Sequence, residues 1–489
     1  MSLLYEWLEN AVRNRSASGG TGHALIYHDT YLSWRGLLHR VERRSHELAA
    51  MGIRSGDWVG LMVGNDPELV VLALALSKLE AVVTPIDPTT GGRDLDMILE
   101  AVPLRAIVTR PNAIDPLAAP SGTLRIHHAP QAPRVKPEIK YRISGTLLSC
   151  SLYSCAAPKV DAESAPEVVL FTLDSGGDPK AVLRGRAQLQ GIADTLAAGF
   201  SVGISSNVLC SAPLFDCQGF DFGLLASLPN QATLYLDDGT AAPRMAKLLF
   251  DYAIDLFAAT PRDFAALSHV TNAKSLRQHG TRLVCSGVPL PLSVARSCRE
   301  RFGVPVLRAY LSTETGPAAA DLSGDAPDTV GMHLPGVEIR IATSDGAPLG
   351  SGISGLIWVR SQGVATQFLP EISVRGSQVA VGRGLLDGWL RTGDVGYFDA
   401  DRRLHLSHRE DDLVRVDRRA VALGEIESCL EGLSQVKAAQ AHVEYDDAGS
   451  THIVVLVTPG GRCRPDKMLD HCAKQLAPHK VPRRIEIAE

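Results

Sequence analysis

The sequence predicts an α/β protein with a large N-terminal domain of doubly wound parallel sheets, a small β subdomain, and a small α+β lid domain at the C-terminus. From Val59 onward, apolar runs of strand length alternate with segments of helical period, which is the pattern of βαβ units. After Gly331 the runs shorten and glycine turns separate them, which favours the β subdomain. The 489 residues also exceed the usual size of one core.

The N-terminal domain is expected to hold two βαβ sets after an amphipathic helix over 1–14. Proline in its first turn supports the helix over 67–80, because the first turn needs no N–H from that residue. The looser segments 115–138 and 149–166, rich in proline, alanine or small polar residues, predict loops. The expected elements are strands 59–63, 81–86, 106–109, 168–172, 208–212 and 232–236, and helices 67–80, 92–102, 187–200 and 219–228.

Short strands over 337–342 and 355–360 are expected in the β subdomain. Beyond it the pattern becomes α+β, with helices over 423–430 and 465–476 and strands over 436–445 and 452–458. We therefore expect an N-terminal domain over 1–410 and a C-terminal lid over 411–489.

The composition argues against several functions. A net charge of −5 is wrong for a general nucleic-acid surface. No apolar run has the length of a membrane span, and the N-terminus lacks the features of a signal peptide. The nine cysteines follow no framework spacing, so a reducing cytoplasm is expected. Cys150 and Cys155 have no matching pair, and we expect no metal site.

A tight turn over 389–397 contains Asp394 between glycines, in the run Trp-Leu-Arg-Thr-Gly-Asp-Val-Gly-Tyr. A carboxylate fixed in such a turn can accept hydrogen bonds from two ribose hydroxyls. The alternative is an ordinary turn aspartate between strands.

The run Tyr310-Leu-Ser-Thr-Glu-Thr-Gly316 follows an expected strand over 304–308. At the carboxyl end of a strand, Thr313 and Glu314 can hold a phosphate and a magnesium ion. The alternative is a cap that opens a helix.

A loop rich in glycine and serine over 172–180 ends in Lys180. Such a loop can surround phosphates with its N–H groups, but Asp174 and Asp178 would repel them. A flexible surface loop is the favoured interpretation for this segment alone.

Together and in this order, these motifs resemble the adenylate-forming superfamily of acyl- and aryl-CoA ligases, peptide-synthetase adenylation domains and luciferases, over nearly the whole chain. Further matching segments are 59–88, 213–215, 286–290, 330–336, 409–412 and 424–427. The resemblance implies that Tyr310 stacks on adenine and that Asp394 binds ribose. It also implies phosphate and magnesium roles for Thr313 and Glu314. The remaining residues that it implicates are Lys180 and Arg409, which bind the nucleotide, and Asp411, the hinge of the lid.

The chain departs from the superfamily pattern mainly on the nucleotide side. The aromatic motif has Asp216 in place of histidine, and Leu311 replaces a glycine beside the nucleotide. The sequence given ends before the usual Gly-Lys pair, whose lysine grips the α-phosphate. The other departures are Leu173, Asp174 and Gly176 in the phosphate loop, Ala181 after Lys180, and Asp417, Arg418 and Arg419 in the glycine-rich lid loop that borders the pantetheine tunnel.

These departures favour an acyltransferase that moves an acyl group from CoA to the phosphopantetheine of an acyl carrier protein. By analogy with a repurposed transferase of the same superfamily, the setting is expected to be natural-product biosynthesis and the group to be aryl, such as anthraniloyl. Exchange between thioesters is nearly thermoneutral, so the reaction requires no ATP and no further cofactor. The carrier thiolate attacks directly, or a cysteine takes the acyl group first. Cys217 after Asp216 is the first candidate and Cys285 the second, with His333 as a possible base; the alternative for either cysteine is a small buried hydrophobe.

Two alternatives remain open. The chain is an ATP- and magnesium-dependent acyl- or aryl-CoA ligase, with Lys480 or Arg483 in place of the missing lysine, or it is a non-catalytic paralogue. A basic set on the lid is expected to meet CoA phosphates or an acidic carrier, or else to be a solvated face. This set comprises Arg402, Arg403, Arg415, Arg418, Arg419, Lys480, Arg483 and Arg484.

Overall fold

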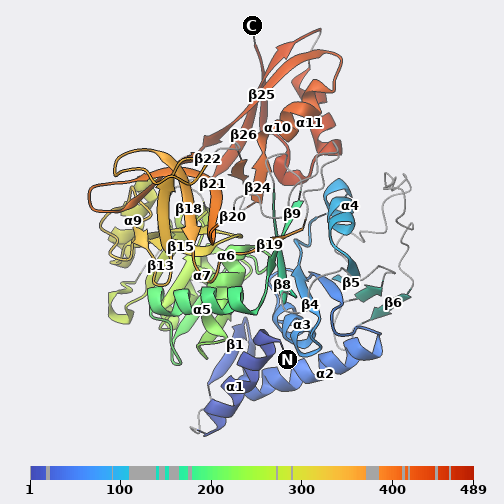
Figure 1. Ribbon diagram of the computed structural model, residues 1–489, viewed down its shortest axis with the longest axis vertical. Coiled ribbons are helices and arrows are strands. Elements are labelled where there is room, and N and C mark those ends of the chain that lie inside the picture. Colours follow the sequence, from blue (N-terminus) through green and yellow to red (C-terminus); the bar gives the residue numbers. More distant parts are fainter. Residues whose placement is uncertain are drawn as a thin grey trace.

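The computed structural model describes residues 2–17, 22–90, 92–109, 139–142, 149–152, 165–173, 179–239, 241–270, 274–287, 290–369, 385–409, 413–416, 419–446, 450–461 and 464–488. Two large sheets and a β subdomain form the body, and the C-terminal lid stands on one end of it (Figure 1). The prediction of an α/β fold with a large N-terminal and a small C-terminal domain is confirmed.

The first large sheet contains the expected βαβ block. Its strands lie in the order β19 (Gln367–Phe368), β9 (Pro179–Arg184), β8 (Val168–Leu173), β4 (Val82–Pro85), β3 (Trp58–Met62), β5 (Leu104–Thr109), β7 (Ser149–Leu152) and β6 (Ile139–Arg142). The helices that accompany it are α1 (Leu3–Ala17), α2 (Trp34–Ala50), α3 (Pro67–Lys78) and α4 (Gly92–Ala101).

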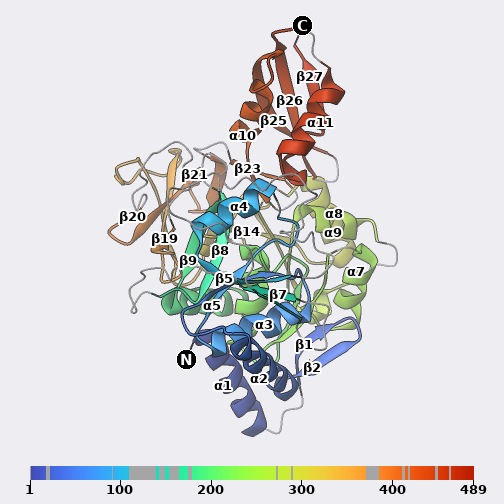
Figure 2. The ribbon, with the colours of Figure 1, turned by 90° about the vertical axis from the view of Figure 1, so that its right-hand side faces the viewer.

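The second large sheet has the order β16 (Met332–His333), β15 (Gly316–Ala320), β14 (Val306–Ser312), β13 (Arg282–Ser286), β12 (Leu256–Ala259), β10 (Asn207–Cys210), β11 (Thr233–Leu236), β1 (His23–Tyr27) and β2 (Thr30–Ser33). Its helices are α5 (Arg186–Phe200), α6 (Cys217–Gly219), the π-helix η2 (Phe220–Leu225), α7 (Ala242–Asp251), α8 (Pro261–Ser268), the 3₁₀ helix η3 (Arg277–His279) and α9 (Leu292–Phe302). Figure 2 shows α7, α8 and α9 together on the side away from the β subdomain.

The alternation of buried side chains along the strands explains this layering. On β3, Val59 and Leu61 join the central core cluster, which contains side chains from both large sheets. Trp58 and Met62 point the other way and pack in the cluster that includes α4. On β10, Leu209 faces α7 to α9. Because neighbouring residues of a strand face opposite sides, each sheet is buried on both faces and needs a layer on each.

Helix α3 lies in the central layer. Asp66 caps it by accepting a hydrogen bond from the Glu68 N–H, and Pro67 occupies its first position. Its residues from Leu69 to Ser77 are all buried. A helix that is apolar all round fits only between two packed surfaces, which is where this one is found.

The β subdomain consists of β17 (Glu338–Ala342), β18 (Gly355–Arg360), β21 (Trp389–Phe398) and β20 (Leu385–Leu386), with β22 (Leu404–Arg409) paired to β21. The lid contains the hairpin β23 (Leu413–Val416) and β24 (Arg419–Ala422), followed by α10 (Leu423–Glu431), β25 (Val436–Tyr445), β26 (Thr451–Pro459), α11 (Pro465–Gln475), the 3₁₀ helix η4 (Pro478–Lys480) and β27 (Arg484–Ile487). The lid has its own hydrophobic core.

Two details of the predicted fold were wrong. Both large sheets are mixed, since β9 pairs antiparallel with β8, and β15 with β14. The loop expected from Ser149 onward begins with β7, because a long-range antiparallel pairing with β5 overrides its weak strand propensity. The helix expected over 219–228 is present, as α6 continued without a break by η2. The segment 115–138 lies outside the described residues. Among the described helices, none is long and apolar enough to cross a membrane.

Candidate active site

Asp394 is held between two donors from different parts of the chain. It lies on β21 opposite Arg409 of β22 in the antiparallel register, and Arg409 Nη1 donates to Asp394 Oδ1 at 3.0 Å. Tyr310, on β14, donates its hydroxyl to Asp394 Oδ2 at 2.5 Å. Burial of Tyr310, with the carboxylate beside it, raises the pKa of its hydroxyl well above the ordinary value. Both oxygens of the carboxylate therefore already accept hydrogen bonds within the chain.

Thr313 and Glu314 form the turn between β14 and β15, so they cap no helix. Ser312 fixes the turn by accepting a hydrogen bond from the Thr315 N–H at 3.1 Å. Lys180 at the start of β9 reaches this turn, with Nζ 3.6 Å from Glu314 Oε1, and it also lies over the ring of Phe368 at 4.3 Å. The structure therefore places Lys180, Thr313 and Glu314 together, and the only cation among them has an acidic and an aromatic partner.

A buried ion pair, which sequence reasoning missed, lies directly beneath this turn. Arg184 on β9 donates from Nη1 to Asp221 Oδ1 at 2.5 Å and from Nη2 to Asp221 Oδ2 at 3.2 Å. Nη2 also donates to the carbonyl oxygen of Thr313 at 2.8 Å. Both side chains are completely buried. The signal was a charged residue inside each of two apolar segments, since such residues are buried only with a partner.

The Arg184–Asp221 pair adjoins the segment that contains Asp216 and Cys217. Asp221 lies on η2, which directly follows α6. Asp216 begins α6 by accepting from the Gln218 N–H at 2.9 Å. A β-carbon added at Gly219 would lie 2.1 Å from the carbonyl oxygen of Pro213, so glycine is required for this close approach. Cys217 is 3% exposed and packs in the central core cluster. π-Helices occur often at functional sites, which is consistent with a site here.

Cys285 stands apart from Cys217. It belongs to the core cluster of α7, α8 and α9 rather than to the central one, and it is 2% exposed. Burial raises the pKa of its thiol far above the ordinary value, which disfavours the reactive thiolate. His333, the proposed base, is exposed on β16. The structure therefore does not assemble the two cysteines at one place.

The basic set of the lid does not form one exposed face. Lys480 is 1% exposed and Arg419 is paired with Asp87, whereas Arg484 is exposed and paired with Glu444. The expectation of a uniform solvated or carrier-binding set is therefore wrong for Lys480, because that side chain is buried between acidic partners. Residues outside the described parts include Asp411, Arg418, Asp174 and Asp178, and the side chain of Arg415 is not described.

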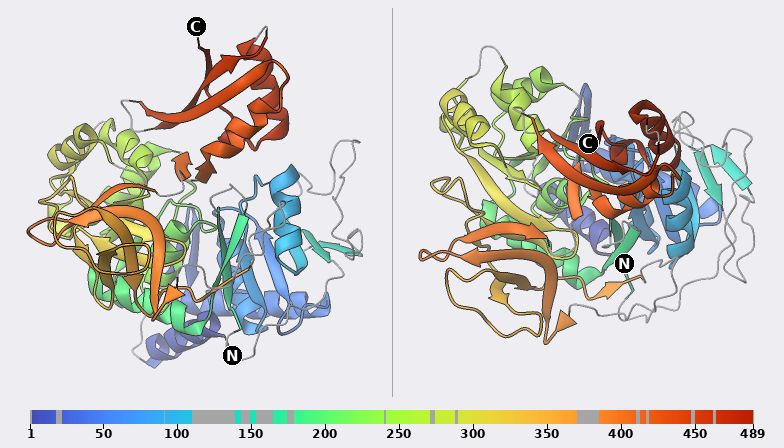
Figure 3. Two further views of the ribbon diagram at one scale, coloured as in Figure 1. Left: turned by 45° about the horizontal axis from the view of Figure 1, so that its top comes forward. Right: turned by 90° about the horizontal axis from the view of Figure 1, so that it is seen from above.

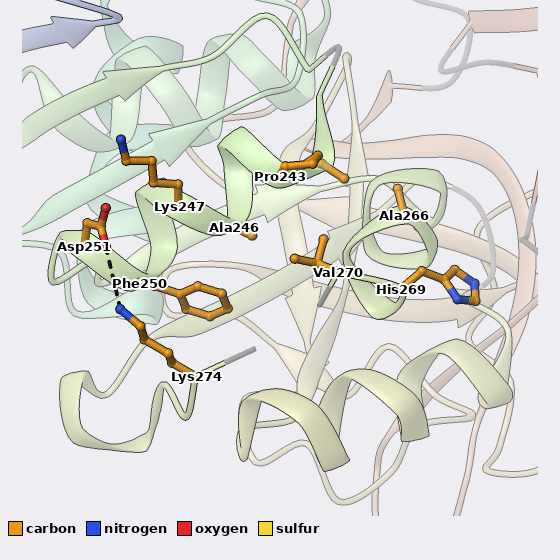
Figure 4. Close-up of a pocket in the computed structure, with 10 residues that line it drawn as sticks. Pro243, Ala246, Lys247, Phe250, Asp251, Ala266, His269, Val270 and Lys274 are labelled. Atoms are coloured by element: carbon orange, nitrogen blue, oxygen red, sulfur yellow. Dashed lines mark ion pairs between the residues drawn. The ribbon is translucent and has the colours of Figure 1, made fainter. Parts of the chain in front are cut away.

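A separate hollow of about 520 Å³ lies between α7 and α8 (Figure 4). Its lining includes Phe250 and Val270, and Lys274 pairs with Asp251 at its edge at 3.8 Å. None of its lining residues belongs to the motifs above. Within the described chain, no group of three or more histidine, cysteine or acidic side chains is arranged to hold a metal.

Comparisons with known proteins agree on the relationship. Residues 13–369 match the family described as AMP-binding enzyme. A probable CoA ligase from Humulus lupulus is 26% identical over 485 residues, covering 95% of this chain and 89% of that protein. A double mutant of o-succinylbenzoate CoA synthetase from Bacillus subtilis, bound with its product analogue OSB-NCoA, has a TM-score of 0.79 at 20% identity, covering 99% of this chain and 94% of that chain. The same synthetase with its acyl-adenylate intermediate has a TM-score of 0.68 at the same identity and coverage.

Proposed function

The chain belongs to the AMP-binding enzyme family, and within it we propose an acyltransferase that moves an acyl group from CoA to the phosphopantetheine of an acyl carrier protein without ATP. Its relatives include CoA ligases, so chemistry on acyl-CoA thioesters is common to this proposal and to the family. The acyl group that we propose is aryl, as in the anthraniloyl-CoA transferase of aurachin biosynthesis, which the chain resembles by functional analogy. The corresponding setting is secondary metabolism, with a cytoplasmic enzyme.

The single observation that supports this proposal best is the environment of Asp394. A ribose would need this carboxylate to accept its hydroxyls, yet Tyr310 and Arg409 each donate to one of its oxygens. Nucleotide binding in the family manner must share this carboxylate with the buried Tyr310 hydroxyl and with Arg409, which already take one acceptor position on each oxygen. Thioester exchange avoids this competition for Asp394, because it needs no nucleotide.

The likeness to solved structures is compatible with this proposal. The chain matches the product-analogue complex of o-succinylbenzoate CoA synthetase with a TM-score of 0.79 and the adenylate complex with 0.68. At 20% identity this likeness supports a shared fold, which both the transferase and a ligase would have.

The chemical step needs little from the protein. The carrier thiolate attacks the carbonyl carbon of the acyl-CoA, the bond from that carbon to the CoA sulfur breaks, and CoA leaves as a thiolate that takes up a proton. In the covalent version, Cys217 Sγ accepts the acyl group from CoA and then yields it to the carrier. Cys285 is the weaker candidate, because its raised thiol pKa leaves almost no thiolate.

The test is the intact mass of a phosphopantetheinylated carrier protein incubated with this enzyme and a panel of aryl- and acyl-CoAs without ATP. We expect a mass gain equal to one acyl group. Cys217→Ala separates the two routes, since it abolishes covalent transfer and spares direct transfer. Cys298→Ala is the matched control, because Cys298 is also buried but lies in the cluster of α7 to α9. If the carrier gained no mass with any of these acyl-CoAs, the transferase proposal would be contradicted.

The second candidate is an ATP-dependent acyl- or aryl-CoA ligase. Lys180 and Glu314 lie 3.6 Å apart at the turn that the family resemblance assigns to phosphate and magnesium, which favours this candidate. ATP and magnesium would be cofactors only in this case. Formation of acyl-CoA and AMP from free acid, CoA and Mg-ATP, with no carrier acylation in the absence of ATP, would establish it.

A further inference from the structure

Two cations of the lid meet one short stretch of the N-terminal domain. Lys480, at the end of η4, has its Nζ 3.2 Å from Asp94 Oδ1 in the first turn of α4, and 3.0 Å from Glu425 Oε2 in the first turn of α10. The Lys480 side chain is 2% exposed. An ammonium so deeply buried is tolerated only with acidic partners, and here one partner lies in each domain.

The second contact comes from another element of the lid. Arg419, at the start of β24, has Nη2 2.5 Å from Asp87 Oδ2 and donates from the same atom to Thr89 Oγ1 at 2.9 Å. Asp87 and Thr89 belong to the turn that links β4 to α4, so both acceptor groups precede Asp94 by only a few residues. Figure 1 shows α4 directly below the lid, and the left view of Figure 3 shows the lid lying over this side of the body.

We propose that Arg419 and Lys480 are positioning residues that fix the lid on the N-terminal domain. We call the two ion pairs Arg419–Asp87 and Lys480–Asp94 the domain clamp. The two ion pairs start from different elements of the lid, β24 and η4, and end at neighbouring points of the N-terminal domain. Together they therefore restrain both rotation of the lid and its separation from that domain. The proposal rests on these contacts alone and not on which reaction the enzyme performs.

The clamp assigns Lys480 a role that differs from replacing a catalytic lysine. If the lid rotates, Glu425 moves with Lys480, but Asp94 stays behind with the body. Rotation therefore removes one of the two partners of a buried cation and leaves Asp94 without its own. We therefore expect the closed clamp to be the resting arrangement of the lid. Any other arrangement of the lid requires both ion pairs to open.

The experiment combines two neutralising substitutions, Asp87→Asn and Asp94→Asn, and measures amide hydrogen exchange by mass spectrometry together with the radius of gyration in solution. We expect exchange in β24 and α4 to become at least five times faster and the radius to increase. Glu338→Gln is the matched control, since it neutralises an exposed carboxylate paired with Arg360 in the β subdomain, and it should change neither quantity. Unchanged exchange in β24 and α4 of the folded double variant would overturn the clamp.

A charge exchange covers the case in which the double variant does not fold. Asp87→Arg or Arg419→Asp alone places like charges together and should release the lid, whereas the two changes combined restore an ion pair and should return exchange to within twofold of the wild type. Failure of the combination to restore docking, although each single change releases it, would contradict pairing as the cause. The carrier assay is run separately, so loss of the transferase proposal would leave the result on docking intact.

Discussion

Arg184 and Lys480 are both buried cations, but their ion pairs connect different parts of the molecule. The partners of Arg184, Asp221 and the Thr313 carbonyl, all lie in the N-terminal domain. Lys480 divides its contacts between Glu425 in the lid and Asp94 in the body. The first pairing therefore fixes a turn permanently, whereas the second can be broken by a domain movement without unfolding either domain. The N-terminal half of the site is built as a rigid unit, and its lid half depends on docking.

The largest effect is expected from Arg184→Met. It removes the cation that pairs with Asp221, whose side chain is completely buried, and removing one partner of a buried ion pair costs about 3–5 kcal/mol of unfolding free energy. Urea unfolding measured by circular dichroism checks this value. The combination with Asp221→Leu should recover most of the loss, because no charge then remains buried. A loss below about 1 kcal/mol for the single change would show that water reaches Asp221.

Lys480→Met should cost less, about 2 kcal/mol, because Asp94 and Glu425 are 19% and 12% exposed and can reach water once the lid is released. The comparison predicts a further difference: the loss appears as undocking and raised exchange in α4, whereas Arg184→Met affects the unfolding of the N-terminal domain. Lys474→Met on α11 is the control, since Lys474 is exposed on the same domain. If Lys480→Met and Lys474→Met changed stability and exchange equally, Lys480 would have no special part in docking the lid.

The same comparison explains what the sequence could predict. Tyr310, Thr313, Glu314, Asp394 and Lys180 all belong to short local motifs, and the structure brings them into two contacting groups. A motif is recognisable because its residues lie close together in the sequence, so its chemistry can be predicted from a short segment. Their roles in binding stay predictions. The overall fold was predictable for a related reason, since strands and helices follow from local periodicity.

The residues that sequence reasoning missed depend on contacts between distant parts of the chain. Arg184 and Asp221 are 37 residues apart, and Lys480 and Asp94 are 386 apart. A periodic pattern cannot show that residues so far apart in the sequence form a pair. Which charged side chains become buried is decided only when the layers pack. Antiparallel β7 and β9 were missed on the same ground, because their strand character comes from the neighbouring strand rather than from their own residues.

A fall in pH should lower the stability of the lid more than that of the N-terminal domain. His479 lies beside the clamp, and burial, with Arg419 and Lys480 nearby, lowers its pKa from 6.5 to about 3. The unfolded chain therefore binds a proton below pH 6.5 that the folded lid does not accept until about pH 3. Stability present above pH 6.5 is lost progressively as the pH falls toward 3. We expect a loss of about 1 kcal/mol at pH 5, reduced by solvent screening.

Thermal unfolding between pH 7.5 and pH 5 measures this loss, and His479→Gln should flatten the dependence because glutamine does not titrate. His442→Gln is the control, since His442 is about half exposed on β25 and its removal should leave the acid dependence as it is. If His479→Gln loses as much stability as the wild type on acidification, another group is responsible.

The smallest effect on stability is expected from Tyr310→Phe, about 0.5–1 kcal/mol, because Asp394 keeps its bond from Arg409 when the hydroxyl is removed. The variant also tests whether the nucleotide side is blocked by this hydroxyl. Freed of one donor, the carboxylate could accept a ribose hydroxyl, so Mg-ATP should raise the melting temperature of the variant more than that of the wild type. Tyr397→Phe on the same strand is the control, because it keeps the ring stacked on His405.

Stabilisation of the wild type by Mg-ATP at least as large as that of Tyr310→Phe would mean that Tyr310 yields its bond to the nucleotide at little cost. The rigid half of the site would then be competent for adenylation as it stands, and the ligase would become the better proposal. If Mg-ATP stabilises only the variant, the Tyr310 hydroxyl is the group that prevents nucleotide binding at a site that otherwise keeps its shape.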